Sequence, residues 1–220
     1  MYDPAKIEGL LQNIFPATIA VKAVFSVEKA HILTKNELIY LKNITAKERA
    51  EGFIMGRIAA HETMNSISLA GDILRHENGS PNWPDGITGS ISHKNGIAIA
   101  AVGQKIHLQS IGLDVEKILI DEKILVRIAK PEEQRWINED KSNSARRLTQ
   151  LFAAKEALYK ALFPLTKTFF GFKDATLLWE NDSFNAHITK TMPAVTLSSQ
   201  YKVLISQHED LVFAGISISN

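Results

Sequence analysis

The segment Gly112-Leu113-Asp114-Val115-Glu116 decides how the second half of this 220-residue chain folds. Aliphatic residues at Ile111, Leu113 and Val115 alternate with a glycine and two acids, and this period of two is typical of a β-strand. One face of the predicted strand carries the aliphatic side chains, and the other carries both carboxylates. An acidic pair on a strand face is a candidate cation site, although most such pairs are simply solvated.

A second segment, Lys155-Glu156-Ala157-Leu158-Tyr159-Lys160, lies in a predicted helix. Glu156 and Lys160 are one turn apart, and such a pair often does no more than stabilise a helix by about 0.2–0.5 kcal/mol. Taken together, however, the two segments supply three carboxylates and two ammonium groups. A magnesium ion carrying a diphosphate suits this set, because Mg²⁺ prefers carboxylate, water and phosphate oxygens while lysines neutralise the remaining charge.

The composition narrows the class of protein. The chain is 45% hydrophobic and 22% charged, which is typical of a globular protein, and its net charge of +1 gives no field for nucleic acid or an anionic membrane. It has no cysteine, which excludes disulfides, thiolate nucleophiles and cysteine-bound metals. The N-terminus does not resemble a signal peptide, and no apolar run approaches the ~20 residues that span a bilayer. We therefore expect a cytoplasmic protein without a transmembrane segment.

Local patterns predict helices and strands in both halves. Thr34-Lys35-Asn36-Glu37 and Thr45-Ala46-Lys47-Glu48 read as capping boxes, the second starting a helix to about residue 67. Residues 76–90 are rich in Gly, Pro, Asn and Ser, which predicts a loop. The other predicted elements are a buried strand at 97–102, a helix starting at Pro131, a helix at 145–163 capped by Ser144 and ended by Pro164, and strands at 175–179, 183–188, 201–206 and 211–218, the last two joined by a turn at 208–210.

Each half therefore reads as helices with antiparallel strands, and the fold class is predicted to be α+β. The boundary is inferred from the repetition of this pattern, which gives an N-terminal half at 1–105 and a C-terminal half at 106–220. No repeat is visible at the level of individual residues.

Five ordered blocks resemble the 4′-phosphopantetheinyl transferases of the larger, Sfp-type class, and most closely the enterobactin synthase component D subgroup. The blocks lie between about Thr45 and Lys160 and are Gly56-Arg57, Trp83-Pro84, Gly89-Ser90-Ile91-Ser92-His93, Gly112–Glu116 and Phe152–Lys160. The resemblance implies two pseudo-symmetric α/β halves, each with helices on a small, mostly antiparallel sheet. It also implies a monomer that binds coenzyme A and apo carrier proteins, and no nucleic acid.

The implied activity is transfer of the phosphopantetheine arm of coenzyme A to a carrier-protein serine, releasing adenosine 3′,5′-bisphosphate. By resemblance, Asp114, Glu116 and Glu156 bind Mg²⁺ on the diphosphate. Glu156 is also the base towards the serine, directly or through a water, while Lys155 and Lys160 contact phosphate oxygens. The carrier would be a peptidyl, aryl or acyl carrier, and the subgroup points to siderophore (enterobactin-type) biosynthesis.

The N-terminal half would bind the rest of coenzyme A. The resemblance assigns Ser92 and His93 to its phosphates and Arg57 to its 3′-phosphate. The segment Gly79-Ser80-Pro81 would lie along the adenine, with Ser80 where the family often has lysine. Glu132 aligns with an acid that is sometimes catalytic in the family, and equally suits a helix N-terminus. Lys94 is adjacent to His93 and is as readily explained by solvation.

Three alternatives are weaker. A non-catalytic coenzyme A or nucleotide-binding module that docks carrier domains would be favoured by loss of an acid or lysine, and all of them are present. A carrier-binding scaffold without coenzyme A affinity is disfavoured by Arg57 and the Ser92-His93 pair. A metal hydrolase would show His-Glu-x-x-His or Gly-x-Ser-x-Gly, and the sequence has neither.

Overall fold

The structure, a computed structural model, describes residues 2–94, 96–119, 121–195 and 199–220. The chain forms two units: the N-terminal unit contains residues 1–111 and 218–220, and the C-terminal unit contains residues 112–217. Strand β6 (Leu108–Lys117) starts in the first unit and continues into the second. The division predicted from the sequence, between residues 105 and 106, falls just before this strand.

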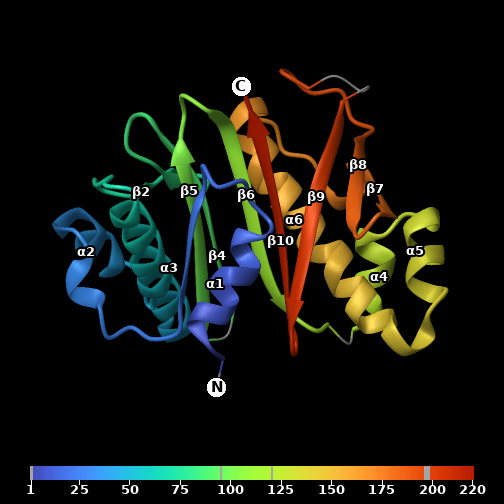
Figure 1. Cartoon of the computed structure of the whole chain (residues 1–220), viewed down its shortest axis with the longest axis horizontal. Coiled ribbons are helices and arrows are strands. Elements are labelled where there is room, and N and C mark those ends of the chain that lie inside the picture. The colour runs from blue at the N-terminus through green and yellow to red at the C-terminus, as the bar shows by residue number, and fades with distance from the viewer. Residues whose placement is uncertain (1, 95, 120, 196–198) are drawn as a thin grey trace. The chain divides into compact units, whose positions relative to one another are not determined.

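The N-terminal unit contains helices, short strands and a three-stranded sheet of order β1-β5-β4 (Figure 1). Its elements are α1 (Pro4–Gln12), β1 (Ala20–Val24), η1 (Ala30–Ile32), α2 (Lys35–Leu41), α3 (Lys47–Ser66), β2 (Leu74–Arg75), β3 (Pro81–Asn82), β4 (Ile87–Lys94) and β5 (Ile97–Gln104).

The central strand β5 is the predicted apolar run, and Ile97–Val102 are all fully buried. It pairs antiparallel with β1 on one side and with β4 on the other, and α3 packs against it. A strand covered in this way needs apolar residues on both faces, which explains why the run is continuous rather than alternating.

Helix α3 is buried on most of its circumference, from Gly52 to Met64. Ile58, Ala59 and Ala60 are completely buried in the core of this unit. Burying a side chain such as Ile58 contributes about 1.5–3 kcal/mol, so the core fixes α3 firmly on the sheet.

One of the two predicted capping boxes is confirmed. At the start of α2, the Thr34 hydroxyl accepts from Glu37 N and the Glu37 carboxylate accepts from Thr34 N. The box predicted at Thr45 is wrong, because α3 begins after Ala46, which has no side-chain cap. Glu48 is then the second residue of the helix, one position too early for its carboxylate to accept the N–H of the N-cap residue.

The predicted loop at 76–90 is only partly a loop. The short strands β2 and β3 form a hairpin around residues 76–80, with Leu74 paired to Asn82 and Arg75 to Pro81. Strand β4 begins at Ile87. Turn-forming residues therefore mark the hairpin tip correctly but conceal the two-residue strands beside it.

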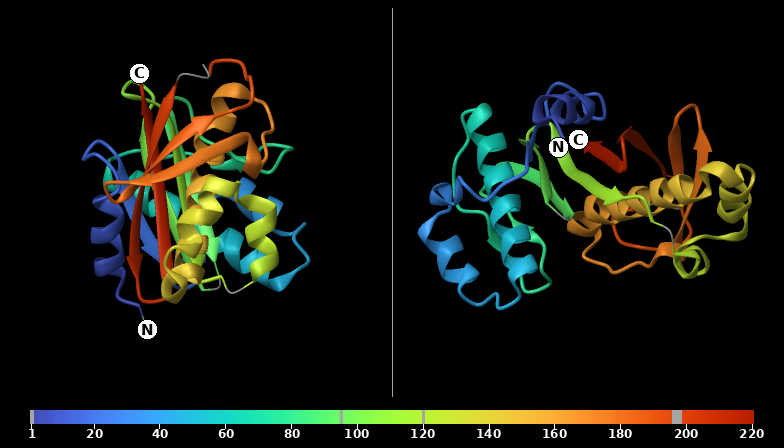
Figure 2. Two further views of the ribbon diagram at one scale, coloured as in Figure 1. Left: turned by 90° about the vertical axis from the view of Figure 1, so that its right-hand side faces the viewer. Right: turned by 90° about the horizontal axis from the view of Figure 1, so that it is seen from below.

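The C-terminal unit contains a five-stranded sheet of order β6-β10-β9-β8-β7 with the long helix α6 along one face (Figure 2). Its other elements are α4 (Glu122–Ile128), α5 (Pro131–Asn138), η2 (Lys141–Asn143), α6 (Ser144–Thr166), η3 (Phe172–Asp174), β7 (Ala175–Glu180), β8 (Ser183–Ile188), β9 (Gln200–His208) and β10 (Leu211–Ser219).

The predicted strands of this unit are confirmed, including the β9–β10 hairpin in which His208 pairs with Leu211. Helix α5 starts at Pro131 as predicted. Helix α6 differs from its prediction, because Pro164 lies inside it and the helix ends at the left-handed Lys167. A proline in the last turn forfeits only one backbone hydrogen bond, so the helix continues past it.

The fold class is α+β, as predicted: in each unit, helices pack on a sheet whose recorded strand pairs are antiparallel. Among the described residues, no helix is long and apolar enough to span a membrane.

Candidate active site

The acidic face of β6 lies against helix α6. Gly112 shares that face with Asp114 and Glu116, because strand side chains alternate. A Cβ atom on Gly112 would lie 1.9 Å from the carbonyl oxygen of Ala157, so only glycine permits this approach. The close contact places the two acids of the strand opposite the Lys155–Lys160 segment of the helix.

Lys160 is the first partner of these acids. Its Nζ donates to Asp114 Oδ1 over 2.7 Å and to the carbonyl of Leu113 over 3.1 Å. Asp114 is 4% exposed and Glu116 is 8% exposed, so both carboxylates are largely removed from water. Asp114 and Lys160, both of them candidate site residues, therefore form an ion pair.

Glu156 joins the group electrostatically. Burial and the negative charges of Asp114 and Glu116 raise the pKa of Glu156, and the positive charge of Lys160 opposes the increase. Asp114 and Glu116 are buried, Glu156 is half-buried, and the charges of both acids and of Lys160 act on Glu156. Each additional positive charge placed there would relieve repulsion among them.

This donor set fits a magnesium ion in its chemistry. Mg²⁺ binds proteins through one or two carboxylates and completes its shell with waters and substrate phosphates, so the protein need not supply a closed cage. In the described part of the chain, no group of three or more His, Asp or Glu side chains is placed to hold a metal ion by itself. Asp114, Glu116 and Glu156 are oxygen donors with excess negative charge, which is what such an ion requires.

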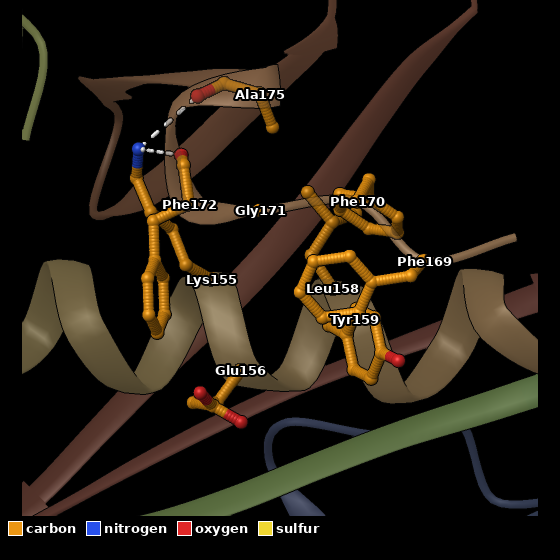
Figure 3. Close-up of a pocket in the computed structure, with 9 residues that line it drawn as sticks. All are labelled: Lys155, Glu156, Leu158, Tyr159, Phe169, Phe170, Gly171, Phe172 and Ala175. Carbon is orange, nitrogen blue, oxygen red and sulfur yellow. Dashed lines mark hydrogen bonds between the residues drawn. The ribbon is translucent and has the colours of Figure 1, made fainter. Parts of the chain in front are cut away.

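Lys155 does not lie where the sequence placed it. Its Nζ pairs with Glu133 and donates to the carbonyls of Ile128, Phe172 and Ala175 at 2.6–3.1 Å. The side chain is 3% exposed. Figure 3 shows Lys155 and Glu156 on opposite sides of the helix. Consecutive helical residues point about 100° apart, so Lys155 cannot share the direction of Glu156. Lys155 therefore forms a buried ion pair in this structure, and its contact with phosphate stays a prediction.

Glu133 is the partner that sequence reasoning missed, having chosen its neighbour Glu132. Glu132 is half-buried in the first turn of α5, whereas Glu133 is fully buried. Glu133 accepts from the backbone N–H groups of Lys130 and Leu177 as well as from Lys155. The available signal was its position: an acid three residues after an N-cap commonly folds back to cap the helix.

An apolar pocket of about 180 Å³ opens beside Glu156 (Figure 3). Tyr159 stands at its centre, with its ring packed against those of Phe163, Phe169 and Phe170. Phe169 is 70% exposed, so part of this aromatic wall faces solvent. The pocket can receive an uncharged chain next to a carboxylate.

The N-terminal unit has a cavity of about 210 Å³ with a basic lining. Arg49, Arg57, Arg75 and His93 all contribute to it. Of these, Arg49 and Arg75 were missed by the sequence analysis, because neither lies in a recognisable motif. Three guanidinium groups around one cavity indicate an anionic ligand, since arginine presents a fork of donors that matches phosphate oxygens.

Arg57 is the most buried of the three arginines. Burial lowers the pKa of Arg57 to about 10, and the nearby charge of Glu37 opposes the decrease. The guanidinium is thus still charged at neutral pH. Its Nη2 donates to Leu74 O over 3.3 Å and its plane covers the Phe53 ring at 4.6 Å, while Nε has no hydrogen-bond partner among the described residues. A desolvated guanidinium that lines the cavity is suited to bind an anion.

His93 reaches the same cavity because α3 has a glycine beneath it. A Cβ atom on Gly52 would lie 2.6 Å from the imidazole ring. Ser92 is buried and points to the other face of β4, so the Ser-His pair is divided between two environments. Lys94, at the end of β4, is half-buried and is not among the residues that line the cavity.

The hairpin tip supplies two further predicted residues. Gly79 and Pro81 line the cavity, whereas the Ser80 hydroxyl donates to Asn78 Oδ1 instead. Arg75 Nε donates to the carbonyl of Gly79 over 2.7 Å. A cation is therefore present at this loop although Ser80 replaces the expected lysine.

Comparisons with known proteins match both units to one family. The 4′-phosphopantetheinyl transferase N-terminal domain family matches residues 36–103, and the 4′-phosphopantetheinyl transferase superfamily matches residues 110–214. The chain is 33% identical over 180 residues to the 4′-phosphopantetheinyl transferase PptT of Mycobacterium tuberculosis, covering 79% of each chain. It is 39% identical over 183 residues to the transferase Npt of Nocardia iowensis, covering 80% of each.

Two more distant similarities were found. Enterobactin synthase component D of Salmonella typhimurium is 32% identical over 124 residues, which is 55% of this chain and 51% of that protein. Holo-[acyl-carrier-protein] synthase of Thermotoga maritima has 23% identity and a TM-score of 0.40 over 49% of this chain and 61% of that one. Two family matches that together run from residue 36 to 214, with relatives that align over most of their length, show that this chain belongs to the 4′-phosphopantetheinyl transferase superfamily.

Proposed function

We propose that this protein transfers the 4′-phosphopantetheine arm of coenzyme A to a serine hydroxyl of an apo carrier protein and releases adenosine 3′,5′-bisphosphate. The observation that carries the proposal is the charge-coupled group of Asp114, Glu116, Glu156 and Lys160 in a chain of this family. Such a group suits a diphosphate that must gain a cation before its phosphorus can be attacked.

The carboxylates would hold Mg²⁺ against the diphosphate of coenzyme A. When bound, the ion would neutralise negative charge on the diphosphate and on the departing bisphosphate. Asp114, Glu116 and Glu156 are its proposed ligands. Lys160, which pairs with Asp114, would then contact the phosphate oxygens.

Glu156 is the proposed general base. In the reaction the serine oxygen forms a bond to the β-phosphorus, the diphosphate P–O bond breaks, and the serine proton passes to Glu156 or through a water to it. Glu156 is the carboxylate that the helix contributes to this group, and without a metal ion burial and the neighbouring acids raise its pKa. Lys155, which pairs with Glu133, is assigned a structural role in this proposal.

The rest of coenzyme A would bind in two further places. The basic cavity of the N-terminal unit suits the 3′-phosphate, with Arg57 as the buried contact and Arg49, Arg75 and His93 around it. The backbone of Gly79–Pro81 would lie along the adenine. The aromatic pocket beside Glu156 suits the uncharged pantetheine arm.

The acceptor would be a peptidyl, aryl or acyl carrier protein, bound by a monomer. Similarity to enterobactin synthase component D supports a carrier of siderophore assembly.

The test is incubation with coenzyme A, Mg²⁺ and a panel of apo carriers, read by the intact mass of each carrier. We expect addition of one phosphopantetheine, reversible loss of activity on chelation, and no transfer by a folded Asp114→Ala variant. Coenzyme A binding without modification of any carrier would instead indicate a non-catalytic binding module.

A further inference from the structure

A fully buried carboxylate, Glu37, lies behind the basic cavity. Its Oε2 accepts from Thr34 N over 2.9 Å and its Oε1 accepts from Ile73 N over 3.0 Å. The imidazole Nε2 of His61 lies 2.8 Å from Oε2 and 3.0 Å from Oε1. Glu37 is 0% exposed, so water contributes nothing to these contacts.

Glu37 also faces Arg57. Its Oε1 lies 3.8 Å from Arg57 Nε. The other polar tether of Arg57 is the carbonyl of Leu74, the residue that follows Ile73. Glu37 is thus the charge partner of the guanidinium. Because it also accepts the N–H of Ile73, it holds in place the segment whose Leu74 carbonyl accepts from the guanidinium.

His61 completes the arrangement from the helix that carries Arg57. The two residues are four positions apart on α3 and therefore lie on one face of it. Burial alone would raise the pKa of Glu37, but hydrogen bonds from His61, Thr34 and Ile73 outweigh it and the pKa is lowered. Glu37 is thus ionised at neutral pH, and Nε2 of His61 carries the hydrogen that it donates.

We propose that Glu37 and His61 are positioning residues for Arg57, and that through Arg57 they set the preference of this enzyme for a ligand that bears a 3′-phosphate. This inference rests on the proposed function only in assigning the 3′-phosphate to Arg57. Glu37 has no place in the predicted motif blocks, and neither residue contacts the ligand in this assignment.

The charge of Glu37, considered alone, predicts the opposite effect on binding of the 3′-phosphate. A negative charge 3.8 Å from an anion-binding arginine weakens the field that the phosphate meets. If charge alone mattered, removing Glu37 would strengthen binding of the 3′-phosphate. If position matters more, removing or shortening Glu37 weakens it.

Two variants of Glu37 separate these effects. Glu37→Gln removes the charge and keeps the length, whereas Glu37→Asp keeps the charge and shortens the reach. His61→Leu removes the donor, and His61→Gln restores one. The matched control is Glu133→Asp, which shortens the other buried helix-capping carboxylate, in the C-terminal unit, at comparable structural cost.

The measurement is the dissociation constant for coenzyme A and for dephospho-coenzyme A, by calorimetry on protein shown to be folded by circular dichroism. The quantity of interest is the ratio of the two constants, which a general loss of stability does not change. We expect this preference for coenzyme A to fall about three- to tenfold in Glu37→Asp, Glu37→Gln and His61→Leu, since a displaced charged contact keeps part of its energy. His61→Gln should recover most of it, and Glu133→Asp should leave it unchanged.

The outcomes are distinct. An unchanged preference in folded Glu37 and His61 variants overturns the inference, as does an increase in Glu37→Gln with no change in Glu37→Asp. If only the His61 variants fold, the contrast between His61→Leu and His61→Gln decides. A wild type that binds both ligands equally refutes the 3′-phosphate assignment as well, and carrier modification measured separately shows whether the transferase activity survives.

Discussion

Replacing Lys155 by methionine tests whether this lysine is structural, as its contacts indicate, or chemical. The variant removes the charge while keeping a similar volume. Glu133 would remain buried with its negative charge, and three backbone carbonyls would lose a donor. Breaking a buried ion pair by removing one partner costs about 3–5 kcal/mol, largely because the other charge stays uncompensated. Since a domain is stable by only about 5–15 kcal/mol, we expect a large fall in the free energy of unfolding.

The assay is urea unfolding, followed by tryptophan fluorescence because Trp136 and Trp179 stack in the same unit. Lys190 gives a matched control: it also pairs with an acid, Asp174, and donates to a loop carbonyl, but both side chains are about 40% exposed. We expect Lys190→Met to cost less than about 1 kcal/mol. The double variant Lys155→Met with Glu133→Gln should be more stable than Lys155→Met alone, because it removes the stranded charge.

The result that would refute this reasoning is specific. If Lys155→Met unfolds within about 0.5 kcal/mol of the wild type, a range typical of surface substitutions, the buried pair does not stabilise the unit. If that variant also loses carrier modification while binding coenzyme A, Lys155 acts in the transfer itself.

Two further predictions concern packing and pH. Gly112→Ala should destabilise the protein by more than about 3 kcal/mol, because the added Cβ would meet the carbonyl oxygen of Ala157. Gly9→Ala has nothing within 4 Å of its Cβ and should stabilise helix α1 by about 0.5–1 kcal/mol. Thermal unfolding of both variants checks this, and only a small loss of stability in Gly112→Ala would contradict the close approach. Because the folded-state pKa of Glu37 is lowered from its ordinary 4.5, its stabilisation is complete above about pH 4.5 and is lost as the pH falls through the folded-state value. The stability difference between wild type and Glu37→Gln should therefore shrink in acid, and a difference that stays constant down to pH 3 would show that folding does not lower the pKa of Glu37.

The parts of the site that could be predicted are those written in local patterns. The alternation around Asp114 and Glu116 identifies a strand with an acidic face, and the structure places that face against α6. The capping box at Thr34 and the apolar run at 97–102 are likewise local. Each depends on side-chain periodicity or on residues within one turn, so no tertiary information is needed.

The parts that could not be predicted depend on contacts between distant segments. Lys155 and Glu156 are neighbours in the same motif, and only packing decides which of them faces the acidic strand. Glu133 and Glu132 are equally acidic, and the partner that separates them lies 22 residues further along the chain. Arg75 reaches the basic cavity through a two-residue strand, which is too short to leave a periodic signal.

The two units share an arrangement that the sequence conceals. In each, a short helix precedes the long one and has a buried acid at its third position, Glu37 in α2 and Glu133 in α5. Each acid folds back to accept the N–H of the residue before its helix, Thr34 in one case and Lys130 in the other. Only the first box has a hydroxyl at the N-cap, and for this reason only the first is recognisable as a motif.

The other two contacts of Glu37 and Glu133 also correspond between the units. Each acid accepts a backbone N–H from a segment that follows the long helix, Ile73 in the first unit and Leu177 in the second. Each receives its last donor from the long helix itself, His61 on α3 and Lys155 on α6. A histidine in one unit and a lysine in the other leave no repeat in the sequence. Each nevertheless fixes the rotation of its long helix through the corresponding buried carboxylate of its unit. This shared function of the two acids supports a common plan for the two units at the level of individual contacts, and it explains why the lysine beside Glu156 is buried rather than exposed to substrate.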